Sequence, residues 1–185
     1  MIGVDYSSQS VELARKLCRQ YFPPSSSSPS PPTSTSISDD GKITFEVLDL
    51  INDDPTAQPW WPRDAAQGPP SGFDLVLDKG TFDAISLSSS TTTEPSTGRV
   101  KRICELYPSK VLDMVKLDGF LLVTSCNWTE DEVASWFTGA GATGSANETG
   151  KFEVYDRIRY PVFEFGGQKG QGVASVCFRK TKGTS

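Results

Sequence analysis

The sequence predicts an α/β fold with a mostly parallel sheet and an antiparallel hairpin at its C-terminal end. Strand-like apolar runs alternate with helix-like segments as far as residue 137, which is the pattern of strands joined by crossover helices. Two further strand-like runs, 152–160 and 173–178, are separated by about a dozen residues rich in glycine. That connection is too short for a crossover helix, so we expect the two strands to pair antiparallel.

The N-terminal part of the chain predicts a strand followed by a helix. Residues 1–4 form a short apolar run that ends at Asp5. Ser7 or Ser8 can cap the helix, which carries apolar residues at helical spacing as far as Tyr21. We therefore expect a strand that leads directly into an amphipathic helix.

Two more strands are predicted by short runs of β-forming residues. Residues 43–48 form the first run, and Asp49 follows it. Residues 73–77 form the second run, and Asp78 follows it. Each of these strands thus ends at an acidic residue.

The next part of the chain predicts a helix, a buried strand and a second helix. Apolar residues recur between positions 100 and 115, with Pro108 either breaking the helix or opening its second half. The unbroken apolar run 120–124 is typical of a parallel strand that is covered on both faces. Residues 129–132 read T-E-D-E, which is a capping box, so we expect a helix to begin there.

Three polar stretches interrupt this pattern, and we expect them to be disordered insertions: 23–41, 53–72 and 88–98. Every residue from 23 to 36 is Pro, Ser or Thr, a composition that cannot bury enough apolar surface to fold. The chain of 185 residues has room for one domain of ordinary size. We therefore expect a single domain over residues 1–185.

The composition excludes several kinds of chemistry and partner. The chain has no histidine and four cysteines without a C-x-x-C pair, which argues against a metal site and against Ser-His-Asp or Cys-His catalysis. A net charge of −5 argues against nucleic acid as a partner. No apolar run suits a membrane span or a secretory leader, so we expect a cytoplasmic monomer that does not bind membranes.

Acidic residues stand at the tips of three predicted strands: Asp5, Asp49 and Asp78. Ligands of open α/β sheets bind at the carboxyl ends of the strands, where such acids can accept hydrogen bonds from ribose hydroxyls or an adenine amine. The three acids together favour an adenosine-type ligand. The alternative is that each carboxylate only accepts backbone N–H bonds in its own turn.

Four segments carry a resemblance to a known family: 3–7 (GVDYS), 78–84 (DKGTFDA), 124–129 (TSCNWT) and 163–167 (FEFGG). With the terminal hairpin, they resemble the S-adenosylmethionine-dependent protein-lysine methyltransferases that modify translation elongation factor 1-alpha. The resemblance implies a Rossmann-like methyltransferase sheet and S-adenosyl-L-methionine as cofactor. It also implies elongation factor 1-alpha as the protein substrate.

The resemblance also implies roles for individual residues. Asp5, with Tyr6 beside it, would hold the ribose hydroxyls of the cofactor, and Asp49 and Leu50 would contact the adenine edge. Asp78 and the loop after it would contact the methionine end of the cofactor and the incoming lysine.

The residues implied for catalysis are Asp78, Thr81, Phe82, Asp83, Asn127 and Trp128. In this interpretation, Asp78 and Asp83 orient the amine or accept its proton. Phe82 and Trp128 form apolar or π walls around the incoming side chain. The alternative for these two aromatic residues is packing in the core.

The family has a first strand and a glycine-rich turn before the segment that matches residues 3–7, and we expect this first strand to be missing here. Two alternatives to an active methyltransferase therefore remain. One is a non-catalytic remnant that still binds the partner. The other is a nicotinamide-dependent oxidoreductase, which the absence of a strand-preceded glycine fingerprint disfavours.

Overall fold

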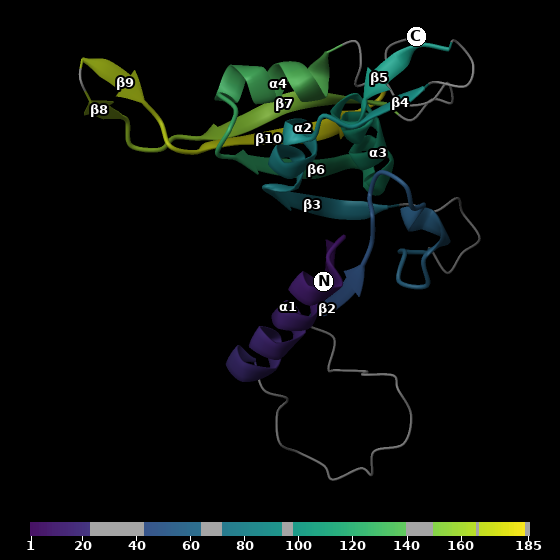
Figure 1. The fold of residues 1–185 in the computed structure, drawn as a ribbon. Coiled ribbons are helices and arrows are strands. Elements are labelled where there is room, and N and C mark those ends of the chain that lie inside the picture. Colours follow the sequence, from purple (N-terminus) through teal and green to yellow (C-terminus); the bar gives the residue numbers. More distant parts are fainter. Residues whose placement is uncertain (23–42, 64–71, 94–97, 140–149, 166, 184–185) are drawn as a thin grey trace, which may run out of the picture. The chain divides into compact units, whose positions relative to one another are not determined.

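The computed structural model describes residues 1–22, 43–63, 72–93, 98–139, 150–165 and 167–183 (Figure 1). The chain divides into two compact units, Met1–Trp60 and Trp61–Ser185. The first predicted insertion, 23–41, lies outside the described residues. Within the described ranges, no helix combines the length and the apolar content needed to cross a membrane.

The N-terminal unit contains a parallel strand pair and one long helix. β1 (Ile2–Asp5) pairs with β2 (Thr44–Val47), and α1 (Ser8–Tyr21) connects to β1 through a short turn. The predicted cap is confirmed, because the Ser7 hydroxyl accepts a hydrogen bond from the Ser10 amide at 3.3 Å. Arg15 of α1 donates to the Phe45 carbonyl, which ties the helix to β2.

The C-terminal unit is built on a four-stranded sheet with the order β3-β6-β10-β7. β3 (Phe73–Lys79) runs parallel to β6 (Val115–Ser125). β10 (Ala174–Thr181) pairs antiparallel with both β6 and β7 (Lys151–Ile158). The predicted α/β class with an antiparallel C-terminal pair is therefore confirmed.

Three helices accompany this sheet: α2 (Thr81–Leu87), α3 (Tyr107–Met114) and α4 (Glu130–Thr138). The core lies between these helices and the sheet, where Phe137 of α4 packs against Phe178 of β10 at 5.2 Å between ring centroids. The capping box predicted for α4 is confirmed by reciprocal hydrogen bonds between Thr129 and Glu132.

Parts of the other two predicted insertions have regular structure. Asp54 caps a short 3₁₀ helix, η1 (Pro55–Ala57). Trp61, which follows a few residues later in the sequence, is buried. β4 (Thr91–Thr93) pairs antiparallel with β5 (Val100–Arg102). Residues 54–61 and 91–93 therefore have defined structure where composition alone indicated loops, whereas residues 64–71 and 94–97 of these predicted insertions lie outside the described residues.

The helix predicted between residues 100 and 115 is shorter than its apolar spacing suggested. β5 and a 3₁₀ helix, η2 (Ile103–Glu105), occupy the first half, and α3 begins only at Tyr107. Pro108 lies in the first turn of α3, so it opens the second half of the predicted helix rather than breaking it.

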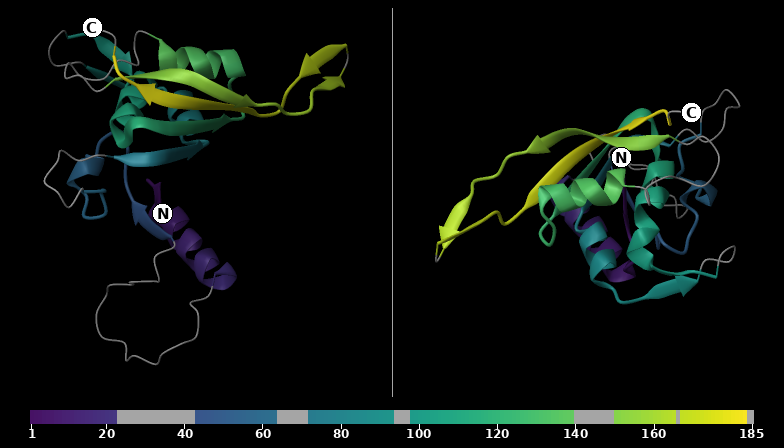
Figure 2. Two further views of the ribbon diagram at one scale, coloured as in Figure 1. Left: turned by 180° about the vertical axis from the view of Figure 1, so that it is seen from behind. Right: turned by 90° about the horizontal axis from the view of Figure 1, so that it is seen from above.

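A second hairpin, which the sequence did not predict, lies between β7 and β10. β8 (Phe163–Phe165) pairs antiparallel with β9 (Gln168–Gly170), and Gly167 in the turn has a φ of 76°. Both views in Figure 2 show this hairpin projecting beyond the four-stranded sheet. Residues 163–165 of the F-E-F-G-G segment therefore form one strand of a β-hairpin.

The buried Lys180 side chain supports the end of α3. Its Nζ donates to the carbonyl oxygens of Leu112 and Val115, each at 2.9 Å, which satisfies acceptors at the helix C-terminus. Burial lowers the pKa of Lys180, and the negative charge of Asp113 acts in the opposite direction.

We expect Lys180→Met to lower the free energy of unfolding by about 2 kcal/mol, because two buried carbonyl groups lose a charged donor. Urea denaturation measures this loss. The control is Lys182→Met, since Lys182 is exposed. Equal stability of the two variants would contradict the capping role of Lys180.

Candidate active site

Asp78 stands near the end of β3 and fixes the start of α2. Its carboxylate accepts hydrogen bonds from the amides of Thr81 at 2.8 Å and Phe82 at 3.1 Å. Gly80 lies between strand and helix with a φ of 84°, a conformation that favours glycine. The D-K-G-T segment is therefore a tight strand-to-helix turn that is closed by its own first carboxylate.

The Asp78 carboxylate also binds Tyr107, the first residue of α3. The phenol hydroxyl donates to Oδ2 of Asp78 at 2.8 Å, and both side chains are buried. Burial raises the pKa of Asp78, although the hydrogen bonds from Tyr107 and from two backbone amides act against the rise. Burial and the nearby charge of Asp78 raise the pKa of Tyr107 well above its ordinary value, so the phenol stays a neutral donor.

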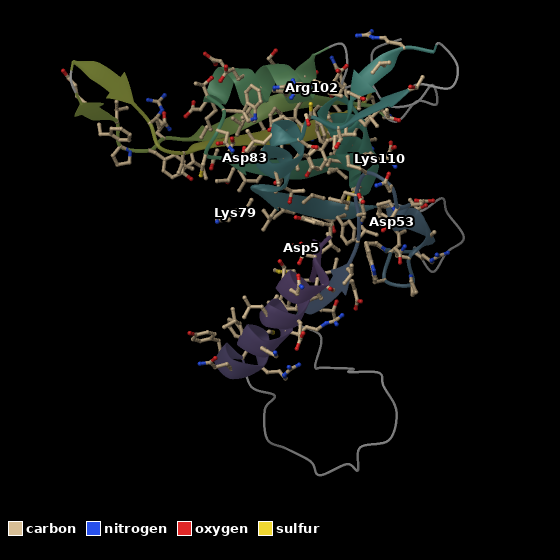
Figure 3. The ribbon with its side chains drawn as sticks, in the orientation of Figure 1. Asp5, Asp53, Lys79, Asp83, Arg102 and Lys110 are labelled. Carbon is tan, nitrogen blue, oxygen red and sulfur yellow. The ribbon has the colours of Figure 1, made fainter. Side chains whose placement is uncertain are left out.

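Asp83 of α2 holds the loop that follows β6. Its carboxylate accepts from the Ser125 hydroxyl at 2.5 Å and from the Cys126 amide at 2.8 Å. Asp83 is only 8 % exposed. Figure 3 shows Asp83 on α2, and it labels Lys79 at the end of β3. The two acids of the 78–84 segment thus fix two different turns at one end of the sheet.

The loop after β6 is held by a continuous hydrogen-bonded network. The Ser125 hydroxyl oxygen accepts from the amides of Asn127 at 3.1 Å and Trp128 at 3.0 Å. The indole N–H of Trp128 donates to the Ser86 hydroxyl at 2.9 Å, and Ser86 donates to the carbonyl of Asp83 at 2.9 Å. Asn127 is exposed and Trp128 is half-buried. The network holds the backbone at Asn127 and both the backbone and the indole of Trp128.

Phe82 lies at the centre of an aromatic cluster and is 1 % exposed. Its ring centroid is 6.1 Å from that of Trp128, 5.6 Å from that of Trp136 and 5.2 Å from that of Phe137. Phe82 therefore packs against Trp128 from the buried side of the cluster. Its burial favours the alternative of core packing over direct contact with a substrate. Thr81 is half-buried at the start of the same helix.

A cavity of about 470 Å³ adjoins this loop, between residues 125–131 and residues 170–174. Asn127 and Trp128 line it, whereas Asp78, Thr81, Phe82 and Asp83 do not. The structure thus brings all six predicted catalytic residues into one unit but places only two of them at this cavity. The other four lie in the turn and helix that support it.

Four of the predicted cofactor-binding residues, Asp5, Tyr6, Asp49 and Leu50, belong to the N-terminal unit. Asp5 and Tyr6 are exposed, and Asp5 accepts a hydrogen bond from the Ser7 amide at 2.8 Å. Asp49 and Leu50 are half-buried, and Asp49 accepts from the Ile51 amide at 2.9 Å. Each acid closes a turn after its strand, and the convergence of Asp5, Asp49 and Asp78 stays a prediction.

Three further residues organise this region without being among the predicted site residues: Ser86, Tyr107 and Ser125. Ser125 lies inside the 124–129 motif, which is the available sequence signal. Tyr107 lies in the apolar pattern between positions 100 and 115, which gives no sign that its hydroxyl is the partner of Asp78. No local pattern distinguishes Ser86 from the many other serines of the chain.

Comparisons with known proteins agree on a class of enzyme. No protein-family model matches the chain. The chain is 32 % identical over 180 residues to the protein-lysine N-methyltransferase EFM4 of Saccharomyces cerevisiae, covering 97 % of this chain and 59 % of the relative. It is 39 % identical over 110 residues to EEF1A lysine methyltransferase 2 of Homo sapiens, covering 60 % of this chain and 39 % of the relative. The chain thus spans less than two thirds of the length of either relative.

The fold also matches a solved structure. A SAM-dependent methyltransferase from Methanosarcina mazei superposes with a TM-score of 0.51 at 15 % identity, covering 97 % of this chain and 81 % of that one. At this identity the likeness shows the fold, which is that of a Rossmann-like methyltransferase.

Proposed function

We propose that the chain belongs to the family of protein-lysine methyltransferases that includes EFM4 and EEF1A lysine methyltransferase 2, and that it methylates a lysine of elongation factor 1-alpha with S-adenosylmethionine as the methyl donor. The observation that carries this proposal is the 32 % identity to the yeast enzyme along 97 % of the chain. No observation specifically favours the non-catalytic alternative.

The residues present suit the cofactor. The Asp5 carboxylate is exposed at a strand tip and accepts a hydrogen bond from the Ser7 amide through one of its two oxygens, so it retains acceptor capacity for ribose hydroxyls. Asp49, Leu50 and Tyr6 would hold the adenosyl group from the same unit. Asp78 is proposed to act by fixing the turn after β3 within the C-terminal unit. When bound, the cofactor supplies an electrophilic methyl group on a sulfonium.

The acceptor lysine must lose its proton before it can attack. Neutralising an amine with a pKa of about 10.4 at pH 7 costs roughly 4 to 5 kcal/mol. A half-buried indole beside an amide group favours the neutral, desolvated amine, and its π face tolerates the charge that forms on transfer. Trp128 is therefore the proposed wall of the amine site, and the Asn127 amide is the group that orients the amine.

Asp83 is proposed as a positioning residue for this site, because both oxygens of its carboxylate already accept hydrogen bonds, one from Ser125 and the other from Cys126.

We further propose that the protein is a cytoplasmic monomer and that it binds neither nucleic acid nor membranes. The net charge of −5 supports the absence of a nucleic-acid partner.

Isothermal calorimetry with S-adenosylmethionine, followed by transfer of labelled methyl to purified elongation factor 1-alpha, tests the function. We expect cofactor binding and label on the elongation factor. Partner capture without any heat of cofactor binding would instead support the non-catalytic remnant.

We expect Asp83→Ala to lower the rate of methyl transfer by about 100-fold, because releasing the loop displaces Asn127 and Trp128 from their working positions. Asp83→Asn keeps one carbonyl acceptor and is expected to lose less. Steady-state kinetics measures both variants, and calorimetry checks that cofactor affinity is unchanged. An Asp83→Ala enzyme with the wild-type rate would contradict the positioning role.

A further inference from the structure

Two hollows of the C-terminal unit share three lining residues, and the two hollows together are called the groove here. The first is the cavity of about 470 Å³ between residues 125–131 and 170–174. The second, of about 560 Å³, follows the end of β7. Glu130, Arg157 and Gln171 line both cavities, so the two hollows meet at these side chains.

The side chains at this meeting point are held by one another. Arg157 lies 2.9 Å from Oδ1 of Asp131 and 3.6 Å from Oε2 of Glu130. The Gln171 amide donates to Oε1 of Glu130 at 3.2 Å. These contacts join the first turn of α4, β7 and the segment before β10. These contacts, at the boundary between the two hollows, are therefore present in the free protein.

The groove is continuous with the proposed acceptor site. Asn127 and Trp128 line its first cavity, and from there the groove extends toward the end of β7. Figure 1 shows the β8–β9 arm projecting at the end of the sheet where α4 begins, beside this region of the same unit. A polypeptide whose lysine reaches Trp128 has this groove available for the residues next to that lysine.

The lining suits a polypeptide better than a phosphate-rich ligand. It combines exposed apolar groups, including Val162, with an amide and with charges of both signs. The charged groups are three carboxylates and two guanidinium groups: Glu130, Asp131, Asp156, Arg157 and Arg159. Arg157 is already paired with two of the carboxylates. The excess of carboxylates favours a segment that carries basic residues.

We propose that this groove binds the extended, basic segment of the protein substrate that adjoins the acceptor lysine. The inference rests on the proposed function and adds to it the surface that recognises the substrate. Asp131 is the specificity-determining residue most open to test, because its side chain is 87 % exposed and can be changed without disturbing the core.

The test compares Asp131→Arg with Glu153→Arg. Both changes reverse an exposed acid and remove one surface ion pair, with Arg157 in the first case and Lys151 in the second. Glu153 lies on β7 but outside the groove lining. We expect Asp131→Arg to raise the KM for elongation factor 1-alpha about tenfold, with kcat and the KM for the cofactor unchanged. Glu153→Arg is expected to keep the wild-type values, and equal KM values for the two variants would overturn the proposal.

A second measurement separates failure of the groove from failure of the proposed function. Absence of methyl transfer by the wild-type enzyme would count against the function. Amide hydrogen exchange with added elongation factor then judges the groove independently of catalysis. Protection of residues 126–131 and 171–173 supports the proposal, and protection confined to other surfaces overturns it.

Discussion

Phe82→Ala is expected to lower the free energy of unfolding by about 4 kcal/mol, the range found when a buried aromatic ring is removed from a core. The Phe82 ring contacts the rings of Tyr107, Trp128, Trp136 and Phe137, so its loss leaves a cavity that several side chains border. Urea denaturation of wild type and variant measures the difference.

Two controls separate this packing role from helix propensity. Leu87→Ala changes an exposed residue at the end of the same helix, and we expect a loss of less than about 0.5 kcal/mol. Phe82→Leu keeps most of the apolar volume and is expected to lose much less stability than Phe82→Ala. A Phe82→Ala protein as stable as Leu87→Ala would show that the cluster does not form.

Asp78→Ala is expected to lower the free energy of unfolding by about 3 kcal/mol. The variant leaves the buried Tyr107 hydroxyl without an acceptor and removes the carboxylate that caps two amides of α2. Asp78→Asn keeps an acceptor oxygen and is expected to lose about 1 kcal/mol. Denaturant titrations at pH 7 compare the two variants, and equal losses would contradict the role of the acceptor oxygen.

The raised pKa of Asp78 gives this pair a defined pH dependence. The carboxylate of Asp78 binds a proton more readily in the folded state than in the unfolded state, where its pKa has the ordinary value of 3.8. Protonation of Asp78 therefore adds to the free energy of unfolding. This addition is fully present below pH 3.8 and is lost as the pH rises through the raised pKa of the folded state. The stability of wild type relative to Asp78→Asn is expected to fall over that interval. A constant difference would contradict the raised pKa.

The sequence predicts best those features whose signal is local. The capping box at Thr129 and the Ser7 cap each depend on residues within one helical turn, and both are present. The antiparallel pair at the C-terminus followed from the length of a connection alone. The ends of two strands were also predicted to within about one residue, because Asp5 and Asp78 follow compact apolar runs: β1 ends at Asp5 and β3 ends at Lys79.

Features that depend on distant partners were not predictable in the same way. Tyr107 acquires its role from a partner 29 residues away. Thr91–Thr93 looked like a polar loop because its strand character comes from pairing with β5. The candidate site is therefore recognisable from its motifs, whereas the hydrogen bonds that hold it require the fold.

Mass spectrometry of elongation factor 1-alpha, after incubation with this protein and S-adenosylmethionine, tests the central claim most directly. We expect one or more lysine residues to gain the mass of a methyl substitution, with a much smaller gain for Asp83→Ala under the same conditions. An unmodified elongation factor, obtained with a folded protein that binds the cofactor, would contradict the assignment of this substrate.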